Sequence, residues 1–296
     1  MEKKVLVTGA SGLIGREICK QLKNHFYVVA IDNGFRGTDI PECDIFENID
    51  IESYVNKSRN DFDYIFHMGN INGTKYFYDI PNDLIENNIL TDFSIFNFVK
   101  KNSACKLIYA SSSEVVAGTI TYPTNEQTDI TINDIHNPRW SYRLGKIVGE
   151  NYLTNSKLNY LIVRFFNIYS EHSKNGHFIK DITDKIKKNE YILIGANETR
   201  SFCHVYDAVD ALIAIKDVSK NVVNIGSDEE ITIIDAANII AKNLGVTNIS
   251  WILKDSLPGS VLRRVPDITL LRKYYPKFRP EKFESAYGRI ANKGNA

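Results

Sequence analysis

Short apolar runs alternate with longer segments of helical periodicity along the first half of this 296-residue chain. Four runs have the length and composition of strands buried on both faces of a parallel sheet, at residues 5–7, 26–31, 63–68 and 106–110. Residues 13–22 and 83–101 carry apolar side chains three and four positions apart, as amphipathic helices do. Strands that alternate with helices predict an α/β fold with a Rossmann-type doubly wound parallel sheet.

The second half of the chain is less regular. We predict strands at 159–169, 191–195 and 224–226, and helices at 178–188 and 232–244. The length suffices for one large core or two joined domains. We therefore predict a Rossmann domain at residues 1–168 and a smaller α/β C-terminal substrate domain at 169–296, with the chain weaving back near 200–215.

Charge and cysteine content narrow the function classes. Lys plus Arg and Asp plus Glu both number 36, which argues against nucleic acid or an anionic membrane as the main partner. The four cysteines have neither disulfide nor metal-ligand spacing, so we predict free thiols and no metal site. Without a membrane-length apolar run or a signal segment, the protein is expected to be cytoplasmic.

A glycine-rich turn follows the first predicted strand, in the sequence KVLVTGASGLIG at residues 4–15. A side chain at such a turn would keep a pyrophosphate away from the backbone N–H groups and the helix N-terminus. Strand, glycine turn and helix together predict a dinucleotide site. The predicted cofactor contacts at this turn are Gly9, Ser11, Gly12, Leu13, Ile14 and Gly15.

Asp32 ends the second predicted strand, where a carboxylate can accept hydrogen bonds from the adenosine ribose hydroxyls. The same charge would repel a 2′-phosphate, so the predicted cofactor is NAD. Asn33 is expected to contact it as well. Arg36 could favour NADP instead, and we interpret it as an ordinary loop cation.

The GxxGxxG spacing after Thr8 resembles the short-chain dehydrogenase/reductase superfamily, in particular its extended branch of NAD-dependent nucleotide-sugar epimerases and dehydratases. The resemblance covers nearly the whole chain. At residues 67–70, HMGN places Asn70 where Ala is common in the family. The resemblance implies further cofactor contacts at Asp44, Ile45, Met68, Gly69 and Asn88, the last as a direct ligand or as structural support.

The resemblance also implies catalytic residues. Tyr142 and Lys146 form a YxxxK pair, and residues four apart lie on one helix face. An ammonium about 5 Å from a phenol is worth roughly 3 kcal/mol at an effective dielectric of about 20, so Lys146 is expected to lower the pKa of Tyr142 by about two pKa units. Tyr142 would be the base, Lys146 would hold the nicotinamide ribose, and Ser112 would orient the sugar hydroxyl, with Ser113 as the alternative register.

The second half carries the implied substrate contacts. Asn167 matches a family position at the nucleotide diphosphate, and Arg200 in TRSFCHVYD matches a phosphate-binding arginine. Arg264, or Arg263 in the neighbouring register, matches a second diphosphate ligand. Together with Ser112 and Ser113, these residues predict a nucleotide-diphosphate sugar as the substrate.

The implied first step is oxidation of a sugar hydroxyl, commonly at carbon 4, and the next step decides the product. A 4-epimerase needs little further machinery and is our first choice. A 4,6-dehydratase or a UDP-glucuronate-type decarboxylase would use Glu114, which could equally be a loop cap; Ser113-Glu114-Val115 resembles the SEV of the decarboxylases. A 4-ketosugar reductase and a non-catalytic NAD-binding regulator are further alternatives. A homodimer is expected, through the helices at 83–101 and 140–152.

Overall fold

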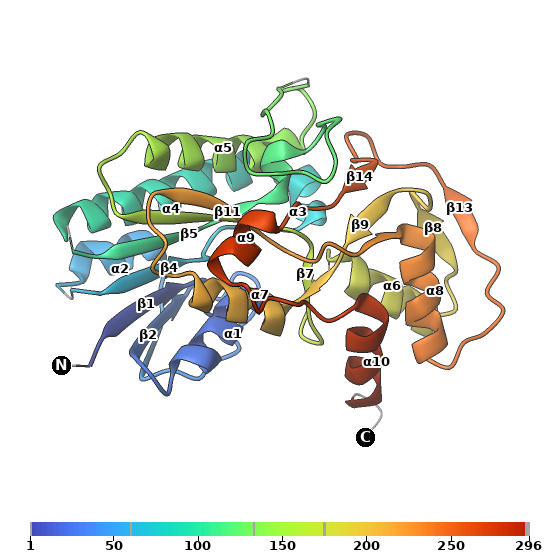
Figure 1. The fold of residues 1–296 in the computed structure, drawn as a ribbon, viewed down its shortest axis with the longest axis horizontal. Helices are drawn as coiled ribbons and strands as arrows, with labels where there is room; N and C mark the ends of the chain where they lie inside the picture. The colour runs from blue at the N-terminus through green and yellow to red at the C-terminus, as the bar shows by residue number, and fades with distance from the viewer. Residues whose placement is uncertain (1, 60, 103, 133, 174–175, 294–296) are drawn as a thin grey trace.

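A seven-stranded parallel sheet forms the centre of the computed structural model, which describes residues 2–59, 61–102, 104–132, 134–173 and 176–293 (Figure 1). Its order is β11-β6-β5-β4-β1-β2-β3, so the strand order reverses at β1, as in a doubly wound fold. This confirms the predicted Rossmann-type fold. The strands are β1 (Lys4–Thr8), β2 (Tyr27–Asp32), β3 (Ile45–Asn48), β4 (Tyr64–His67), β5 (Lys106–Ser112), β6 (Tyr160–Phe165) and β11 (Asn221–Ile225).

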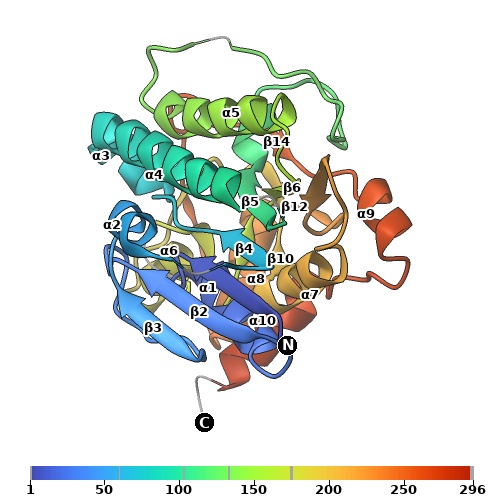
Figure 2. The same cartoon turned by 90° about the vertical axis from the view of Figure 1, so that its left-hand side faces the viewer.

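Helices cover both faces of this sheet (Figure 2). On one face lie α1 (Leu13–Leu22) and α7 (Val205–Ala214), and on the other lie α2 (Ile51–Lys57), α4 (Pro81–Lys101) and α5 (Trp140–Thr154). Side chains alternate along each strand, so Val5 and Val7 of β1 pack toward α1 while Leu6 packs toward α4. Burial on both faces explains why these strands read as continuous apolar runs.

A smaller α/β body packs beside the carboxyl ends of the strands. Its own core gathers apolar residues of α6, α8 and α10 around the aromatic side chains of Tyr169, Phe202 and Phe283. Its elements are β7 (Ile168–Tyr169), α6 (Phe178–Lys187), β8 (Ile192–Ile194), β9 (Thr199–Ser201), β10 (Cys203–His204), β12 (Glu230–Thr232), α8 (Ile233–Asn243), β13 (Ile252–Lys254), β14 (Arg263–Arg264) and α10 (Phe283–Lys293). Three short helices complete the fold: α3 (Thr74–Asp79), η1 (Ser113–Val116) and α9 (Thr269–Tyr274).

The chain crosses between the two bodies more than once. After β10 the chain returns to the large sheet: α7 packs against α1, and β11 forms an edge strand of the sheet. Residues 205–225 therefore belong to the large sheet and its helices rather than to the smaller body. The predicted strand at 159–169 is two strands, because Asn167 has φ +43° and turns the chain out of the sheet. β7 then pairs with β10 rather than with β5.

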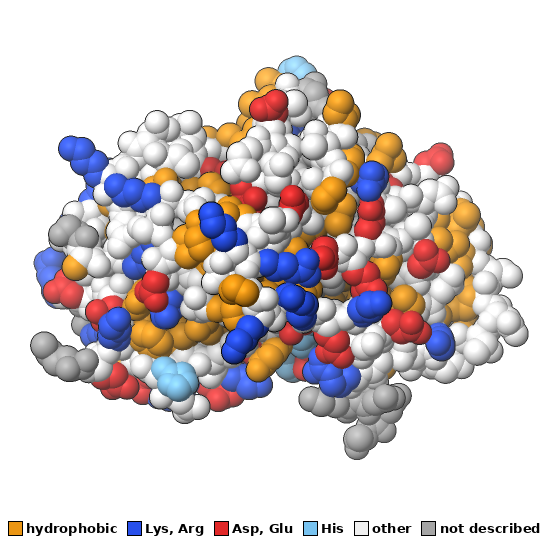
Figure 3. Space-filling view, in the orientation of Figure 1, with side chains coloured by type: hydrophobic (Ala, Val, Ile, Leu, Met, Phe, Trp, Pro, Cys, Tyr) orange, Lys and Arg blue, Asp and Glu red, His pale blue; other side chains and the backbone are white. Residues whose placement is uncertain are grey.

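Basic and acidic side chains are mixed at the surface (Figure 3), as their equal numbers in the sequence predict. Lys and Arg side chains are interspersed with Asp and Glu over the face in Figure 3. Among the described residues, no helix is long and apolar enough to cross a membrane.

Candidate active site

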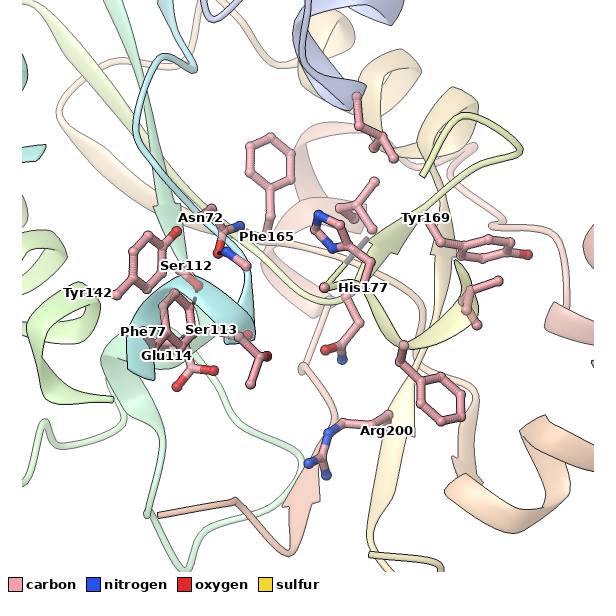
Figure 4. A pocket seen from close by; sticks show the side chains of 18 of the residues that line it. Asn72, Phe77, Ser112, Ser113, Glu114, Tyr142, Phe165, Tyr169, His177 and Arg200 are labelled. Atoms are coloured by element: carbon pink, nitrogen blue, oxygen red, sulfur yellow. Dashed lines mark hydrogen bonds between the residues drawn. The ribbon is translucent and has the colours of Figure 1, made fainter. Parts of the chain in front are cut away.

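A cavity of about 470 Å³ opens where the carboxyl ends of the large sheet's strands meet the smaller body. Its volume is in the range of small-molecule sites, and its place beside the reversal of strand order is where doubly wound folds bind ligands. Figure 4 shows Ser112, Glu114 and Tyr142 on one side, with Arg200 and Tyr169 toward the other. The large sheet and its helices contribute these lining residues: Gly9, Gly12, Gly15, Met68, Asn70, Ser111, Ser112, Ser113, Glu114, Tyr142, Lys146 and Phe165.

The glycine turn leaves no room for side chains. Gly9 has φ +66°, and a Cβ there would lie 2.6 Å from the carbonyl oxygen of Met68. A Cβ on Gly15 would lie 2.2 Å from the carbonyl oxygen of Gly9. The turn therefore brings its backbone to the cavity wall, where Leu13 and Ile14 also lie. This is the surface that a pyrophosphate requires.

Ser11 and Asp32 continue the same surface. The backbone N–H of Ser11 donates to Asp32 at 3.0 Å and that of Gly34 donates to the other carboxylate oxygen at 2.8 Å, so the carboxylate is fixed at the end of β2. The hydroxyl of Ser11 is buried and has no hydrogen-bond partner among the described residues. An unpaired buried hydroxyl beside an oriented carboxylate fits the ribose and phosphate groups of NAD. Asn33 is exposed and accepts from Phe35 N–H at 3.1 Å.

The predicted cofactor contact at Asp44 and Ile45 does not suit the structure. Ile45 begins β3, whereas the nucleotide crevice lies at the carboxyl ends of the strands, beyond Asn48. Asp44 instead accepts from Val28 N–H at 2.8 Å and pairs with Lys23 at the amino ends of the strands. Three residues of strand separate the two edges by about 10 Å, because each residue rises about 3.3 Å.

Gly69 and Asn88 support the site from behind. Gly69 is not among the described residues that line the cavity, and a Cβ there would lie 2.7 Å from Ile51 and 3.0 Å from Thr8. Asn88 exchanges two hydrogen bonds with the backbone of Ile71, at 2.8 and 3.0 Å. Asn88 therefore holds the loop after β4 in place, which favours the structural alternative for this residue.

Ser112, Tyr142 and Lys146 converge on the cavity from β5 and α5. The hydroxyl of Ser112 accepts from Glu114 N–H at 3.2 Å and lies at the same wall as the phenol of Tyr142. The ammonium of Lys146 donates to Asn70 Oδ1 and to the carbonyl oxygen of Ala110, each at 2.6 Å. It lies 6.0 Å from the centre of the Tyr142 ring. The sequence-predicted hydroxyls and ammonium thus face one space.

The electrostatics of the pair differ from the sequence-based expectation. Burial raises the pKa of the Tyr142 phenol above its usual range, and the hydrogen bond from Ser112 acts in the opposite direction. Burial also lowers the pKa of the Lys146 ammonium, whereas Asp92 and Glu150 act to raise it. Within the protein alone, Tyr142 is therefore neutral at neutral pH. The lowering that we expected from Lys146 is not found: the groups that lower the pKa of Tyr142 are Ser112 and Arg264, and burial outweighs both.

Glu114 is held by two arginines rather than left free. Arg139 donates to it from Nη2 at 2.5 Å and from Nε at 3.2 Å, and Arg264 Nη1 lies 2.8 Å away. Burial alone would raise the pKa of Glu114, but the two guanidinium groups hold it well below its usual range. A carboxylate that is this strongly paired is a poor proton acceptor. The arrangement makes Glu114 a counter-ion at the cavity wall.

Two arginines lie side by side at the cavity wall. β14 pairs with β9 so that Arg264 lies beside Arg200, although 64 positions separate them. Nε and Nη2 of Arg264 are buried without a partner among the described residues. Burial lowers the pKa of Arg200 to about 10, the charge of Arg264 adds to this, and Glu198 opposes it. Donors left unpaired beside a second guanidinium fit an anionic group such as a diphosphate.

The remaining predicted substrate contacts have different positions. Ser113 is buried and lines the cavity, as does Asn167, whose side chain donates to the carbonyl oxygen of Ser201 at 2.9 Å. Arg263, the alternative register, is half exposed and pairs with Glu230 at 2.8 Å. The structure therefore turns Arg264 rather than Arg263 into the cavity.

Several cavity residues were missed from the sequence, among them Arg36, His177 and Arg139. Arg36 is no ordinary loop cation: it contacts the Asn72 carbonyl, stacks 5.3 Å above the Tyr76 ring and lines the cavity. His177 also lines it, and burial lowers the pKa of this imidazole to about 4, with Arg36 acting in the same direction. No local spacing marks Arg36 or His177, whereas Arg139 lies one helical turn ahead of Tyr142 in the sequence.

The comparisons with known proteins agree with this geometry. Residues 5–226 match the model of the family described as "NAD dependent epimerase/dehydratase family". A UDP-N-acetyl-alpha-D-glucosaminuronate decarboxylase of Bacillus cytotoxicus is 31% identical over 258 residues, which cover 81% of this chain and 80% of that protein. A putative UDP-glucose 4-epimerase of Methanocaldococcus jannaschii is 28% identical over 268 residues, covering 81% and 82%.

Solved structures show the same fold. The crystal structure of a UDP-glucose 4-epimerase from Thermotoga maritima with UDP-glucose superposes with a TM-score of 0.88 and 19% identity, covering 99% of this chain and 98% of that one. At this identity the likeness shows the architecture, including the smaller body beside the strand ends.

Proposed function

Because the chain belongs to the NAD-dependent epimerase/dehydratase family, the extended branch predicted from its sequence, we propose that it is an NAD-dependent enzyme that converts a nucleotide-diphosphate sugar through a transient 4-keto sugar. The observation that carries this proposal is one cavity with two chemistries. Ser112, Tyr142 and Lys146 lie at one wall of the cavity. Arg264 is paired with Glu114 near this wall, and its neighbour Arg200 lies toward the other side (Figure 4). A substrate with a reactive hydroxyl at one end and a diphosphate at the other fits both.

The residues divide the first step between them. The chemistry that NAD would supply when bound is a hydride acceptor for carbon 4 of the sugar. Tyr142 Oη takes the hydroxyl proton, so it must itself be deprotonated first, against the effect of its burial. Ser112 donates to the developing carbonyl oxygen and keeps the sugar hydroxyl beside the phenol. Lys146 holds its ammonium at the same wall, where a ribose hydroxyl can accept from its remaining N–H.

The pairing of Glu114 argues against one product. A 4,6-dehydratase needs a base for the proton on carbon 5, and the ion pairs with Arg139 and Arg264 make Glu114 unsuitable. A 4-epimerase needs only that the ketosugar turns over before the hydride returns. We propose epimerisation of an NDP-hexose as the primary activity, because it asks for no further catalytic group.

A second candidate is supported by sequence identity. The Bacillus cytotoxicus relative acts on a uronate, as its name states, and it is 31% identical to this chain. A 4-ketone beside a carbon 5 carboxylate can lose CO₂ without a protein base, so the same side chains would serve. Glu114 would then be a fixed counter-ion of Arg139 and Arg264 in either reaction.

The test offers the purified protein UDP-, GDP- and TDP-hexoses together with the corresponding uronates, and follows products by mass spectrometry and NMR. An isomer of unchanged mass supports the epimerase, and loss of CO₂ supports the decarboxylase. Tyr142→Phe should abolish either conversion, while Tyr152→Phe should not, since Tyr152 lies on the same helix but stacks on Phe96. If no sugar is converted, or if Tyr142→Phe equals wild type, the proposal fails.

We also propose a homodimer through the outer faces of α4 and α5. These helices pack side by side, and Leu90 and Val148 on them are exposed at 54% and 38%. Light scattering should give twice the mass of the chain, and Leu90→Glu should shift it toward the monomer. A monomer for the wild-type protein would contradict this.

A further inference from the structure

A buried polar network extends from Lys146 into the space between the sheet and α4. At its centre is Asp92, which lies one helical turn beyond Asn88 and is 1% exposed. Its carboxylate is bonded to three side chains: His67 Nε2 at 2.9 Å, Asn70 Nδ2 at 2.9 Å and the Tyr109 hydroxyl at 2.6 Å. Such a group is costly to bury unless its charge is matched.

Asn70 connects this carboxylate to Lys146. Its amide nitrogen donates to Asp92, while its amide oxygen accepts from the ammonium at 2.6 Å. Asn70 is the residue that departs from the small side chain common in the resembling family. An alanine has no atoms to make this bridge. The departure at position 70 and the acid at position 92 therefore form one unit.

We propose that Asp92 and Asn70 are positioning residues that keep the Lys146 ammonium charged and fixed at the cavity wall. The part of this inference that concerns turnover rests on the proposed function. The part that concerns the charge of Lys146 stands on the free protein.

Among the acids near Lys146, Asp92 is the one that keeps the ammonium charged. Glu150 is the other acid that acts on the ammonium, and it is already bonded by Arg164 at 2.7 and 2.9 Å. Tyr142 of α5 and Tyr109 of β5 also face Lys146, as neutral phenols. Burial lowers the pKa of Lys146, and Asp92 is the largest opposing influence. Without Asp92 the ammonium would lose the largest of the influences that compensate for its burial.

The residues around Asp92 leave space for its hydrogen bonds and hold its partners in place. A Cβ on Gly149 would lie 2.2 Å from the Tyr109 hydroxyl and 3.2 Å from an Asp92 carboxylate oxygen, so α5 needs glycine there. On the far side, Thr8 Oγ1 lies 2.8 Å from His67 Nδ1. We assign the His67 proton to Nε2, because the Asp92 carboxylate can only accept. Each neighbour of Asp92 is thereby fixed.

The decisive measurement is the protonation of Lys146 in the protein without cofactor or sugar. NMR of ¹³Cε-labelled lysines gives this directly, with the Lys146 signal assigned by its absence in Lys146→Arg. Asp92→Asn should move the Lys146 titration to lower pH. The double variant Asn70→Asp with Asp92→Asn, which moves one carboxylate next to the ammonium, should restore it. Asp217→Asn serves as the control, because Asp217 accepts from Tyr64 near the other buried lysine, Lys106.

Turnover supplies the second readout. Asp92→Asn should lower kcat by roughly ten-fold or more, since a misplaced catalytic contact costs up to about 10²-fold. It should also shift the alkaline limb of the pH–rate profile to lower pH, with KM nearly unchanged, and the double variant should restore the limb. A merely structural role would reduce thermal stability and leave the limb where it is.

An unchanged Lys146 titration in Asp92→Asn, or no recovery in the double variant, would overturn the proposal. If Asp92→Asn does not fold, Asn70→Ala takes its place, with the same expected shift. If the wild-type protein converts no sugar, the proposed function fails while the NMR result still decides the role of Asp92.

Discussion

Two buried lysines lie at opposite ends of β5 in closely similar surroundings. Lys106 begins the strand and donates to the carbonyl oxygens of Tyr160 and Val218 at 3.0 and 2.6 Å. Lys146 donates to the carbonyl oxygen of Ala110 near the other end, at 2.6 Å, and to Asn70. Both lysine residues are at most 5% exposed.

Each lysine also has a tyrosine–aspartate pair beside it. Near Lys106 the Tyr64 hydroxyl donates to Asp217 at 2.6 Å, and near Lys146 the Tyr109 hydroxyl donates to Asp92, also at 2.6 Å. The difference lies in what else each ammonium faces. Lys146 lines the cavity, whereas Lys106 is not among the described residues that do.

This comparison separates burial from function. A buried, charge-compensated lysine is by itself a structural device, since Lys106 ties β5, β6 and the segment before β11 together. What makes Lys146 a candidate for catalysis is its access to the cavity and its place one turn from Tyr142. The predictions below test that distinction.

The largest expected effect is on turnover. Lys146→Met should lower kcat/KM by about 10²–10⁴-fold, the range for loss of acid–base catalysis, because the ammonium beside Tyr142 would be gone. Lys106→Met, the matched change at the other end of β5, should remain within about two-fold of wild type. Initial rates of sugar conversion measure both. Equal losses in the two variants would erase the distinction between the two lysines.

A smaller effect is expected on substrate binding. Here the adjacent residues Arg264, at the cavity, and Arg263, at the surface, offer the same comparison between a residue that lines the cavity and one that does not. Arg264→Met should weaken binding of the nucleoside diphosphate by about ten- to a hundred-fold, as loss of a charge-assisted hydrogen bond of about 1.5–3 kcal/mol implies. Arg263→Met should change it little, because Arg263 pairs with Glu230 at the surface. Isothermal titration calorimetry with UDP, GDP and TDP would show this, and a greater loss in Arg263→Met would reverse the assignment.

The smallest expected effect is on stability and depends on pH. Burial lowers the pKa of Lys106 to about 8, below the value of about 10.4 in an unfolded chain. Between these values the unfolded state binds more protons, so the free energy of unfolding rises with pH. Relative to Lys106→Met, the wild-type protein should therefore gain stability as the pH rises above about 8. Urea denaturation at several pH values tests this; a difference that is flat or falls with pH would contradict it.

Local sequence was enough for much of the fold and for part of the site. The alternation of buried strands and helices predicted the doubly wound sheet, and the turn at Gly9, Gly12 and Gly15 lies where the glycines predicted it. Tyr142 and Lys146 share a helix face because they are four residues apart. Each of these predictions depends on spacing within one element or one turn.

Other predictions failed where the answer depended on register or on distant elements. Asp44 was placed at the nucleotide because an acid followed by an aliphatic residue is a short pattern, and only the pairing of β3 with β2 shows that it lies at the wrong edge. The strand predicted at 159–169 breaks at Asn167, whose positive φ no periodicity reports. Arg36 was read as a surface cation because its contact with Asn72 spans 36 positions.

By itself, then, the sequence determined the fold class, the glycine turn, Asp32 at the end of β2 and the YxxxK face, since periodicity and short spacings act through the backbone geometry of single elements. Only the tertiary structure decided which charges meet. It pairs Glu114 with Arg139 and Arg264, sets Arg264 beside Arg200, and links Asp92 to Lys146 through Asn70. These contacts join residues brought together by sheet order and packing, and burial then fixes their strength by removing water.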